Sequence, residues 1–263
     1  MKIGIAGYGY VGQAHEHILK EYYDLIISDP AKGHYGDLGH ADAIIICVAT
    51  PQKEMSGSCD VNNVCDVIDD AKRVDVPILI KSTISPEGWR LIKDTCSNKN
   101  ITFSPEFLRA ETWKEDTVNQ KDYYFGGADC NFWSDIFLKA RGNINIDIAQ
   151  PEELILAKQL RNSYLALKVT FFNQVYDYCE REEIDFESVR KLVTNDKRIG
   201  DSHSHVTEKR GFGGHCFPKD LSAIINSFDT YGLLEAVEEV NNQVREDRDW
   251  EHMVGRAVLE EEE

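Results

Sequence analysis

Hydrophobic and polar residues follow two different patterns along the chain, and the change falls near residue 148. Before it, short apolar runs alternate with amphipathic stretches, which predicts strands alternating with helices and therefore a mostly parallel sheet. The runs that predict strands are residues 2–7, 24–29, 43–50, 77–83, 101–107 and 122–127. Two of them, 43–49 and 77–81, are almost continuously apolar, as expected of central strands with helices on both faces. The pattern predicts a doubly wound α/β fold, Rossmann-like in architecture.

Beyond residue 148 the apolar residues recur at helical spacing. A long helix is predicted from Pro151, because proline at the first helical position and the two glutamates after it are start signals. A second helix is predicted over 185–196 with Asp185 as its cap, and a third, or a pair, over 232–258. Residues 197–217 have little periodicity and predict a loop. We therefore expect an α/β domain over 1–148 and an all-helical domain over 149–263.

Three glycines near the N-terminus have the spacing of a dinucleotide-binding fingerprint. Gly7, Gly9 and Gly12 follow the first predicted strand and precede a helical pattern, the context in which G-x-G-x-x-G cradles a pyrophosphate. Asp29 ends the next predicted strand, where an acid binds ribose hydroxyls and repels a 2′-phosphate. The fingerprint predicts NAD as the cofactor, although glycines in a plain turn would show the same spacing.

The segment "GFGGHCFPKD" (211–220) contains a cysteine whose position suggests reactivity. Cys216 follows a glycine-rich stretch and precedes Pro218, which can start a helix, and a nearby helix N-terminus and Lys219 both favour a thiolate. Two alternatives stay open on local grounds. Cys216 could be an ordinary buried cysteine, or it could bind a metal together with histidines. The candidate histidines are His203, His205 and His215, in a spacing that is uncommon for zinc.

Other polar residues are placed where they could serve the same chemistry. Lys158 and Asn162 are four residues apart and therefore share one face of the predicted long helix, where they could donate to one substrate oxygen. The same spacing also occurs on ordinary polar helix faces. Thr83 ends one predicted strand and Glu106 lies at the end of another, at the carboxyl edge of the sheet where doubly wound folds bind ligands.

Composition and charge narrow the classes of protein. The formal net charge of −17 repels nucleic-acid backbones and anionic membranes, so neither is expected as a partner. Seven cysteines without a C-x-x-C pair favour a reducing compartment over a disulfide framework. No run of 18 apolar residues and no apolar signal region occur. We expect a cytoplasmic protein.

Seven motifs together resemble one enzyme family. In chain order they are "GYGYVG", "ICVATP", "KSTISPEG", "SPEFL", "AKQLRNSYLALKVTFFN", "RIG" and "GFGGHCFPKD", the last being the most specific. Residues 1 to about 245 are similar in order and style to the UDP-glucose/GDP-mannose dehydrogenase family. The resemblance implies an NAD-dependent enzyme that oxidises the C6 alcohol of a nucleotide sugar, most often UDP-glucose, to a carboxylate. It also implies a homodimer through the central helices.

The resemblance assigns roles residue by residue. Cys216 matches the nucleophile that forms a thiohemiacetal and then a thioester. Lys158 and Asn162 match the pair that stabilises an oxyanion at C6; Asp220 and Thr83 match residues that hold a water, and Glu106 a general acid or base. The implied cofactor-binding residues are Gly7, Gly9, Tyr10, Val11, Gly12, Asp29, Thr50, Pro51 and Thr83. The implied substrate-binding residues are Phe107, Leu108, Lys158, Asn162, Gly211, Phe212, Gly213, Gly214 and Lys219. No metal site is implied.

Two departures from the family pattern leave other functions open. Many members have a second glutamate where this chain has Ala110, and members normally continue into a third domain that helps bind the nucleotide. We therefore expect a short form with part of the nucleotide site missing. A two-electron dehydrogenase of the β-hydroxyacid type also combines a dinucleotide domain with a helical lysine and asparagine, but it does not require a cysteine. A third possibility is a non-catalytic NAD-binding protein.

Overall fold

The computed structural model describes residues 1–53, 59–71, 76–214, 216–227 and 232–258, and His215 lies outside the described residues. The chain divides into two compact units. Unit 1 comprises Met1–Thr50 and Cys59–Lys158, and unit 2 comprises Pro51–Ser58 and Gln159–Glu263. Unit 1 thus includes the first turns of the long helix, whereas the domain boundary after residue 148 stays a prediction.

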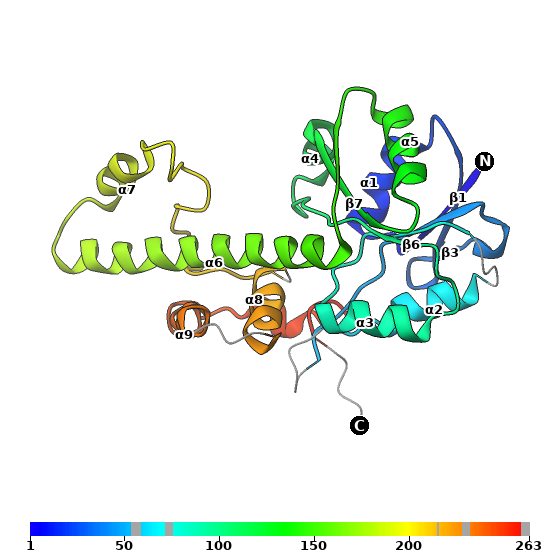
Figure 1. The fold of residues 1–263 in the computed structure, drawn as a ribbon. Coiled ribbons are helices and arrows are strands. Elements are labelled where there is room, and N and C mark those ends of the chain that lie inside the picture. Colours follow the sequence, from blue (N-terminus) through cyan, green and yellow to red (C-terminus); the bar gives the residue numbers. More distant parts are fainter. Residues whose placement is uncertain (54–58, 72–75, 215, 228–231, 259–263) are drawn as a thin grey trace. The chain divides into compact units, whose positions relative to one another are not determined.

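Unit 1 is built on an eight-stranded sheet with the strand order β3-β2-β1-β4-β5-β6-β7-β8 (Figure 1). The strands are β1 (Lys2–Ala6), β2 (Asp24–Asp29), β3 (His34–Tyr35), β4 (Ala43–Ile46), β5 (Ile78–Ile80), β6 (Ile101–Phe103), β7 (Asp122–Gly127) and β8 (Asn145–Ile148). The helices are α1 (Tyr10–Leu19), α2 (Asn62–Asp70), α3 (Pro86–Thr95), α4 (Trp113–Asn119) and α5 (Cys130–Arg141), with short 3₁₀ turns η1 (Pro30–Lys32) and η2 (Leu38–His40). All six predicted strands are confirmed.

The sheet differs from the sequence prediction at its edges. β1, β2, β4, β5 and β6 are parallel, but β3 is antiparallel to β2 and β7 is antiparallel to β6. β7 runs the other way because the chain leaving β6 turns back through α4 and enters β7 at the edge where β6 ended. β8 then pairs in parallel with β7 through the crossover helix α5. The edge strands β3 and β8 were not predicted, since one is very short and the other is polar.

Alternate residues of the central strands point into two separate cores. On β4, Ile44 and Ile46 pack in a cluster with α2 and α3, whereas Ile45 packs in a cluster with α1 and α5. β5 repeats the pattern, with Ile78 and Ile80 in the first cluster and Leu79 in the second. Both faces of the sheet are therefore covered, and the doubly wound fold is confirmed.

Unit 2 consists of helices. The long helix α6 (Pro151–Arg181) enters it from unit 1 and is followed by α7 (Phe186–Thr194), α8 (Cys216–Ser227), α9 (Leu233–Val244) and the 3₁₀ turn η3 (Asp249–His252). α6 begins at Pro151 and Asp185 caps α7 by accepting from the Glu187 amide, both as predicted. The third predicted helical region is divided into α9 and η3. Small apolar clusters, with Phe172 and Phe212 among their buried members, hold these helices together.

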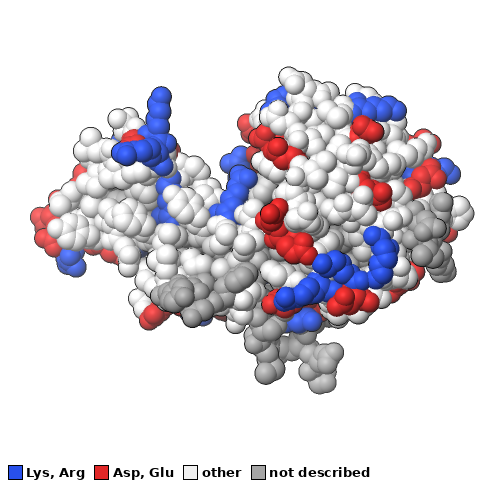
Figure 2. Space-filling view, in the orientation of Figure 1, with Lys and Arg blue, Asp and Glu red and all other residues white. Residues whose placement is uncertain are grey.

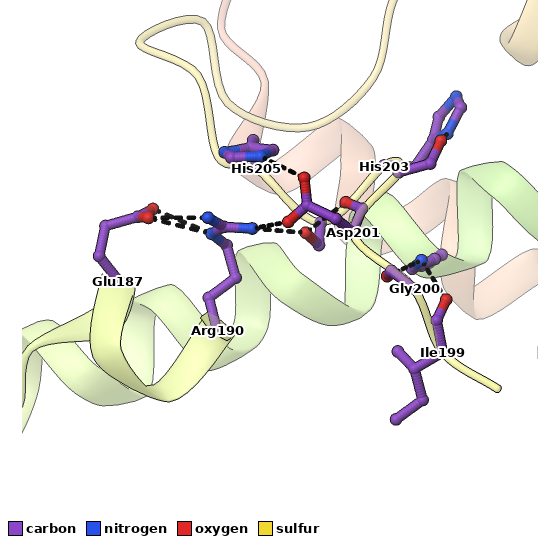
Figure 3. Close-up of polar contacts among 10 residues, drawn as sticks. Glu187, Arg190, Ile199, Gly200, Asp201, His203 and His205 are labelled. Carbon is purple, nitrogen blue, oxygen red and sulfur yellow. Dashed lines mark hydrogen bonds and ion pairs between the residues drawn. The ribbon is translucent and has the colours of Figure 1, made fainter. Parts of the chain in front are cut away.

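The predicted loop between α7 and α8 is fixed by two cations (Figure 3). Arg190 of α7 has a side chain only 5% exposed and contacts Glu187 on one side and Asp201 on the other. It also donates to Ser204 Oγ at 3.0 Å. Lys168 of α6 donates to the carbonyls of Ile199 and Gly200, each at 2.8 Å. The loop that leads to Cys216 is therefore tied to two helices before α8 begins.

Candidate functional site

Two glycines of the fingerprint are required by the packing of the protein itself. Gly7 follows β1 with a φ of +85°, and a Cβ on it would lie 2.6 Å from the carbonyl oxygen of Cys47. A Cβ on Gly12 would lie 2.1 Å from the carbonyl oxygen of Gly7. Because these contacts are with backbone atoms, no side chain fits at either position. The turn and the close approach of α1 to β1 thus depend on Gly7 and Gly12.

The third glycine faces open space. A Cβ on Gly9 would meet no atom of the described residues within 4 Å, apart from its chain neighbours, and its φ of −71° is one that any residue adopts. Gly9 is the N-cap of α1, no side chain caps this helix, and no acidic residue lies in its first turn, which starts with Tyr10 and Val11. An uncapped helix N-terminus beside an open glycine suits a phosphate group. These residues fit the pyrophosphate of NAD.

Asp29 ends β2 beside the fingerprint loop, as predicted. Its Oδ2 accepts the amide of Tyr8 at 2.7 Å, and Lys32 donates to the Tyr8 carbonyl, also at 2.7 Å. The hydroxyl of Tyr8 donates to Glu16, and this bond together with burial raises the pKa of Tyr8 to about 12. The carboxylate is thus held at the place where an NAD ribose is expected.

The loops after β4 and β5 are joined at the carboxyl edge of the sheet. Thr50 Oγ1 donates to the carbonyl of Thr83 at 2.5 Å, which brings together two residues predicted to bind the cofactor. Ser82 Oγ donates to the carbonyl of Val48 at 2.7 Å. Pro51, also predicted to bind the cofactor, is the first residue of unit 2 and is buried.

Glu106 follows β6 and both of its carboxylate oxygens are engaged. Oε2 lies 3.2 Å from the Nζ of Lys81, and Oε1 accepts the amides of Phe107 at 2.8 Å and Leu108 at 3.2 Å. Lys81 also donates to Ser104 Oγ at 3.0 Å and to the Pro105 carbonyl at 3.1 Å. The carboxylate therefore orders the backbone of the two residues that the resemblance assigns to substrate binding.

Burial and charge set the protonation of this cluster. Burial alone would raise the pKa of Glu106, but the Lys81 ammonium and the Phe107 amide outweigh it and the pKa lies below its usual value. Burial, with Lys81 as the second cause, lowers the pKa of His15 to about 4. Burial also raises the pKa of the Cys47 thiol. At neutral pH, Glu106 is a carboxylate beside a neutral imidazole.

Lys158 lies against Phe107. The Nζ of Lys158, a buried residue on α6, is 5.4 Å from the centroid of the Phe107 ring, within the range of a cation–π contact. Glu106, Phe107, Leu108 and Lys158 thus form one connected group in unit 1.

A second group in unit 2 surrounds the first turn of α8. Cys216 is the first residue of α8 and is partly buried. Four residues on, Asp220 is 1% exposed; its Oδ2 accepts from Asn162 Nδ2 at 2.5 Å and its Oδ1 lies 3.5 Å from the Nζ of Lys219. Four predicted site residues, Asn162, Cys216, Lys219 and Asp220, are therefore placed on two adjoining helices.

The glycine-rich loop before Cys216 is held by two asparagine side chains. Asn173 of α6 accepts the amide of Gly211 at 3.0 Å. Asn241 of α9 accepts the amide of Phe212 at 2.7 Å and donates to the carbonyl of Phe212 at 3.1 Å. Gly211 has a φ of +50°, and a Cβ on it would lie 2.3 Å from Asn241 Oδ1. Side chains of α6 and α9 thus hold the loop backbone through hydrogen bonds.

Several of these residues were not predicted from the sequence. His15, Lys81, Asn173 and Asn241 were not singled out. Lys81 had a signal, since a lysine that ends an apolar strand must find a buried partner. The two asparagines lie on helices among many other polar residues, and nothing in their spacing distinguishes them.

Other predictions bear on compartment and partners. None of the seven cysteines, all of which lie in the described part of the chain, forms a disulfide bond. Among the described residues, no three histidine, cysteine or acidic side chains gather in a way that could hold a metal ion, and no helix is both long and apolar enough to cross a membrane. On the face drawn in Figure 2, the described basic and acidic residues are interspersed. Location in the cytoplasm stays a prediction.

The doubly wound fold and the turn from Gly7 to Gly12 together define a dinucleotide-binding protein with a helical unit that carries a cysteine. The family follows from comparison. A family model described as the NAD binding domain of the UDP-glucose/GDP-mannose dehydrogenase family matches residues 31–134, and the central domain of that family matches residues 153–243. The chain belongs to this family and contains its NAD-binding domain, which confirms the predicted cofactor.

Named relatives agree with the family assignment. The UDP-glucose 6-dehydrogenase of Campylobacter jejuni is 30% identical over 210 residues, covering 77% of this chain and 53% of the relative. That of Rickettsia felis is 33% identical over 226 residues, covering 79% and 49%. The chain spans about half the length of these curated relatives. A UDP-glucose dehydrogenase structure from Pyrobaculum islandicum has the same fold, with a TM-score of 0.77 and 24% identity over 92% of this chain and 68% of that one.

The glycines give a prediction that separates ligand binding from folding. We expect Gly9→Val to lower NAD affinity by at least about tenfold while leaving the melting temperature nearly unchanged, because its side chain would meet only the pyrophosphate. Gly12→Ala, in contrast, should lower both. Calorimetric titration with NAD+ and thermal unfolding measure the two properties. Unchanged NAD affinity in folded Gly9→Val would contradict the placement of the pyrophosphate beside Gly9 at the N-terminus of α1.

The low pKa of His15 gives a pH dependence of stability. Unfolded His15 binds a proton below its ordinary pKa of about 6.5, whereas the folded form binds one only near pH 4. The stability that the protein gains from holding His15 neutral is therefore fully present above pH 6.5 and is lost as the pH falls toward 4. We expect the titration of His15 to lower the free energy of unfolding by about 2–3 kcal/mol between pH 7 and pH 4.5. Denaturant unfolding of wild type and His15→Asn over this range should show a decline that is larger by this amount in the wild type, because the carboxylates titrate in both proteins.

Proposed function

We propose that the chain is an NAD-dependent nucleotide-sugar 6-dehydrogenase that converts UDP-glucose to UDP-glucuronate. One observation carries the proposal. Cys216 begins α8, and three buried residues surround the same helical turn: Asn162, Lys219 and Asp220. The other unit of the chain contains the dinucleotide fingerprint of Gly7, Gly9 and Gly12. UDP-glucose is chosen because the named relatives are UDP-glucose 6-dehydrogenases. UDP-N-acetylmannosamine and GDP-mannose are the nearest alternative substrates.

The chemistry requires a nucleophile because an aldehyde cannot lose hydride until a group adds to it. In the proposed reaction the neutral form of Lys158 accepts the proton of the C6 hydroxyl and becomes an ammonium. Gly7, Gly9 and Gly12 would hold NAD+, which would supply the hydride acceptor for each of the two oxidations. The thiolate of Cys216 then adds to the C6 aldehyde, forming a C–S bond, and Asn162 and Lys158 donate to the oxygen as its negative charge develops. Oxidation of this thiohemiacetal leaves a thioester on Cys216.

Hydrolysis completes the proposed cycle. Thr83 and Asp220 hold the attacking water, and Glu106 takes a proton from it as its oxygen bonds to the thioester carbon. The C–S bond breaks, Cys216 leaves as a thiolate, and the carboxylate product is formed. The pKa of Glu106 lies below its usual value, so the group is a carboxylate at neutral pH, the form in which it can accept a proton. Lys219 is proposed to meet substrate phosphate or hydroxyl groups, and Gly214 leaves room for a ligand beside the loop.

The second candidate, a two-electron dehydrogenase of the β-hydroxyacid type, is favoured by one specific likeness. The 3-hydroxyisobutyrate dehydrogenase structure from Mycobacterium tuberculosis covers 94% of this chain and 94% of its own, with a TM-score of 0.67 and 16% identity. That likeness concerns the fold alone. Such a reaction does not require a cysteine, so Cys216 distinguishes the two candidates. A non-catalytic NAD-binding protein is the third.

We further propose a homodimer through α6. Leu160, Tyr164, Phe171 and Tyr178 are between 46% and 60% exposed, and their spacings of four and seven residues place them along one face of the helix. A continuous line of large apolar side chains at this exposure is typical of a helix that packs against another protein surface.

Substrate oxidation is predicted to be a four-electron reaction. With UDP-glucose and NAD+, absorbance at 340 nm should report two NADH for each sugar oxidised. Cys216→Ser should abolish this overall reaction, because a serine hydroxyl adds to the aldehyde less readily than a thiolate and its oxygen is a poorer leaving group. The same assay is repeated with three alternative substrates: UDP-N-acetylmannosamine, GDP-mannose and 3-hydroxyisobutyrate.

The outcomes separate the candidates. One NADH per substrate, with activity retained in Cys216→Ala, would establish the β-hydroxyacid type. NAD binding without turnover of any nucleotide sugar by the folded chain would support the third candidate, a non-catalytic NAD-binding protein. Cys179→Ser serves as the matched control, because Cys179 is buried in an apolar cluster of unit 2 and has no proposed role.

The dimer is tested by one charged residue on the apolar face of α6. Phe171→Asp should convert the wild-type dimer into a monomer in light scattering coupled to size exclusion, because a carboxylate would be buried unpaired in the interface. Leu138→Asp, on an exposed position of α5, is the control and should leave the mass unchanged. A wild-type monomer across micromolar concentrations would contradict the proposal.

A further inference from the structure

An ion pair just beyond α9 lies against the glycine-rich loop. Arg245 follows the last residue of α9 and Asp249 begins η3. Arg245 Nη2 is 3.0 Å from Asp249 Oδ1, and the Arg245 side chain is only 7% exposed. Both residues lie outside the residues matched by the family model of the central domain, which end at 243.

Each member of the pair binds one end of the loop. Arg245 Nη1 donates to the carbonyl of Arg210 at 2.9 Å, and Asp249 accepts the amide of Gly214 with Oδ1 at 3.2 Å and with Oδ2 at 3.3 Å. Arg245 Nε also donates to the carbonyl of Asp247 at 2.8 Å, which fixes the guanidinium itself. The pair therefore spans the loop backbone from residue 210 to residue 214.

Gly213 lies where this ion pair comes closest. A Cβ on Gly213 would be 2.3 Å from Arg245 Nη2 and 2.3 Å from Asp249 Oδ1, so neither charged group could keep its place beside a larger residue. Glycine has the greatest backbone freedom of any residue, and a loop rich in it has to be ordered from outside. Gly213 is thus explained by contact with the protein's own charges.

We propose that Arg245 and Asp249 are positioning residues that fix the loop from 210 to 214 and, through it, the Cys216 thiol. The catalytic part of this inference depends on the proposed role of Cys216 as nucleophile. Small displacements of a reacting group lower the rate of the chemical step strongly, whereas substrate affinity depends on the rest of the site. Loss of the pair therefore lowers kcat more than it changes KM.

The test uses the full chain with Arg245→Met, Asp249→Ala, the double variant and Asp249→Asn. In mass-spectrometric hydrogen exchange, the peptide containing residues 210–214 should exchange at least about tenfold faster in both single variants, because the bonds that close the loop are lost. Asp249→Asn keeps an oxygen for the Gly214 amide and should restore most of the protection. Arg248→Met is the control, since Arg248 pairs with Glu251 near the surface.

Kinetics provide the second measurement. With UDP-glucose, kcat should fall by about tenfold or more in each single variant with KM changed by less than about threefold, and the double variant should be no worse than the more damaged single variant, as expected of two residues that act as one unit. Melting temperatures confirm that the variants are folded.

The two measurements keep this inference separate from the proposed function. Exchange within twofold of wild type in both single variants, or losses of kcat that multiply in the double variant, would overturn the inference. Absence of turnover in the wild type would instead overturn the proposed function, and hydrogen exchange would still decide whether the ion pair holds the loop.

Discussion

Withdrawing a carboxylate from water is costly unless charged and hydrogen-bonding partners replace the solvent, and each unit of this protein is arranged around one such group. In unit 2 it is Asp220, which contacts Asn162 of α6 and Lys219 of α8. In unit 1 it is Glu106, which contacts Lys81 and two backbone amides. The partners come from different elements, so satisfying the carboxylate also fixes those elements relative to each other within the unit. The residues proposed for chemistry are ordered as a consequence.

Glycines in the two functional loops serve two different purposes. Gly7 and Gly12 in the fingerprint, and Gly211 and Gly213 before the cysteine, are required by close contacts with the protein's own atoms. A Cβ on Gly9 or on Gly214 would meet no atom of the described residues within 4 Å, apart from those of its chain neighbours. In each loop, the glycines with close contacts shape the backbone, and the glycine without them leaves space beside it. Sequence spacing by itself treats all of these glycines alike.

The features predicted correctly from the sequence are those that depend on local pattern. Apolar runs predicted the six main strands, Pro151 and Asp185 predicted helix starts, and the fingerprint glycines predicted the tight turn from β1 into α1. Edge strands β3 and β8 and the direction of β7 depend on how distant segments meet, which periodicity does not contain. For the same reason Asn162 and Asp220 could be named separately, but their hydrogen bond across 58 residues could not. Asn173 and Asn241 were missed altogether because their function is to bind backbone far away in sequence.

The long helix α6 has a consequence for the distance between two of the proposed groups. Lys158 is the last residue of unit 1 and Asn162 belongs to unit 2, yet one continuous helix contains both. A helix rises about 1.5 Å per residue, so the two Cα atoms are about 6 Å apart along its axis. Bending the chain between them would break backbone hydrogen bonds of α6. The spacing along α6 of the two residues proposed for chemistry is therefore set by the backbone geometry of a single helix.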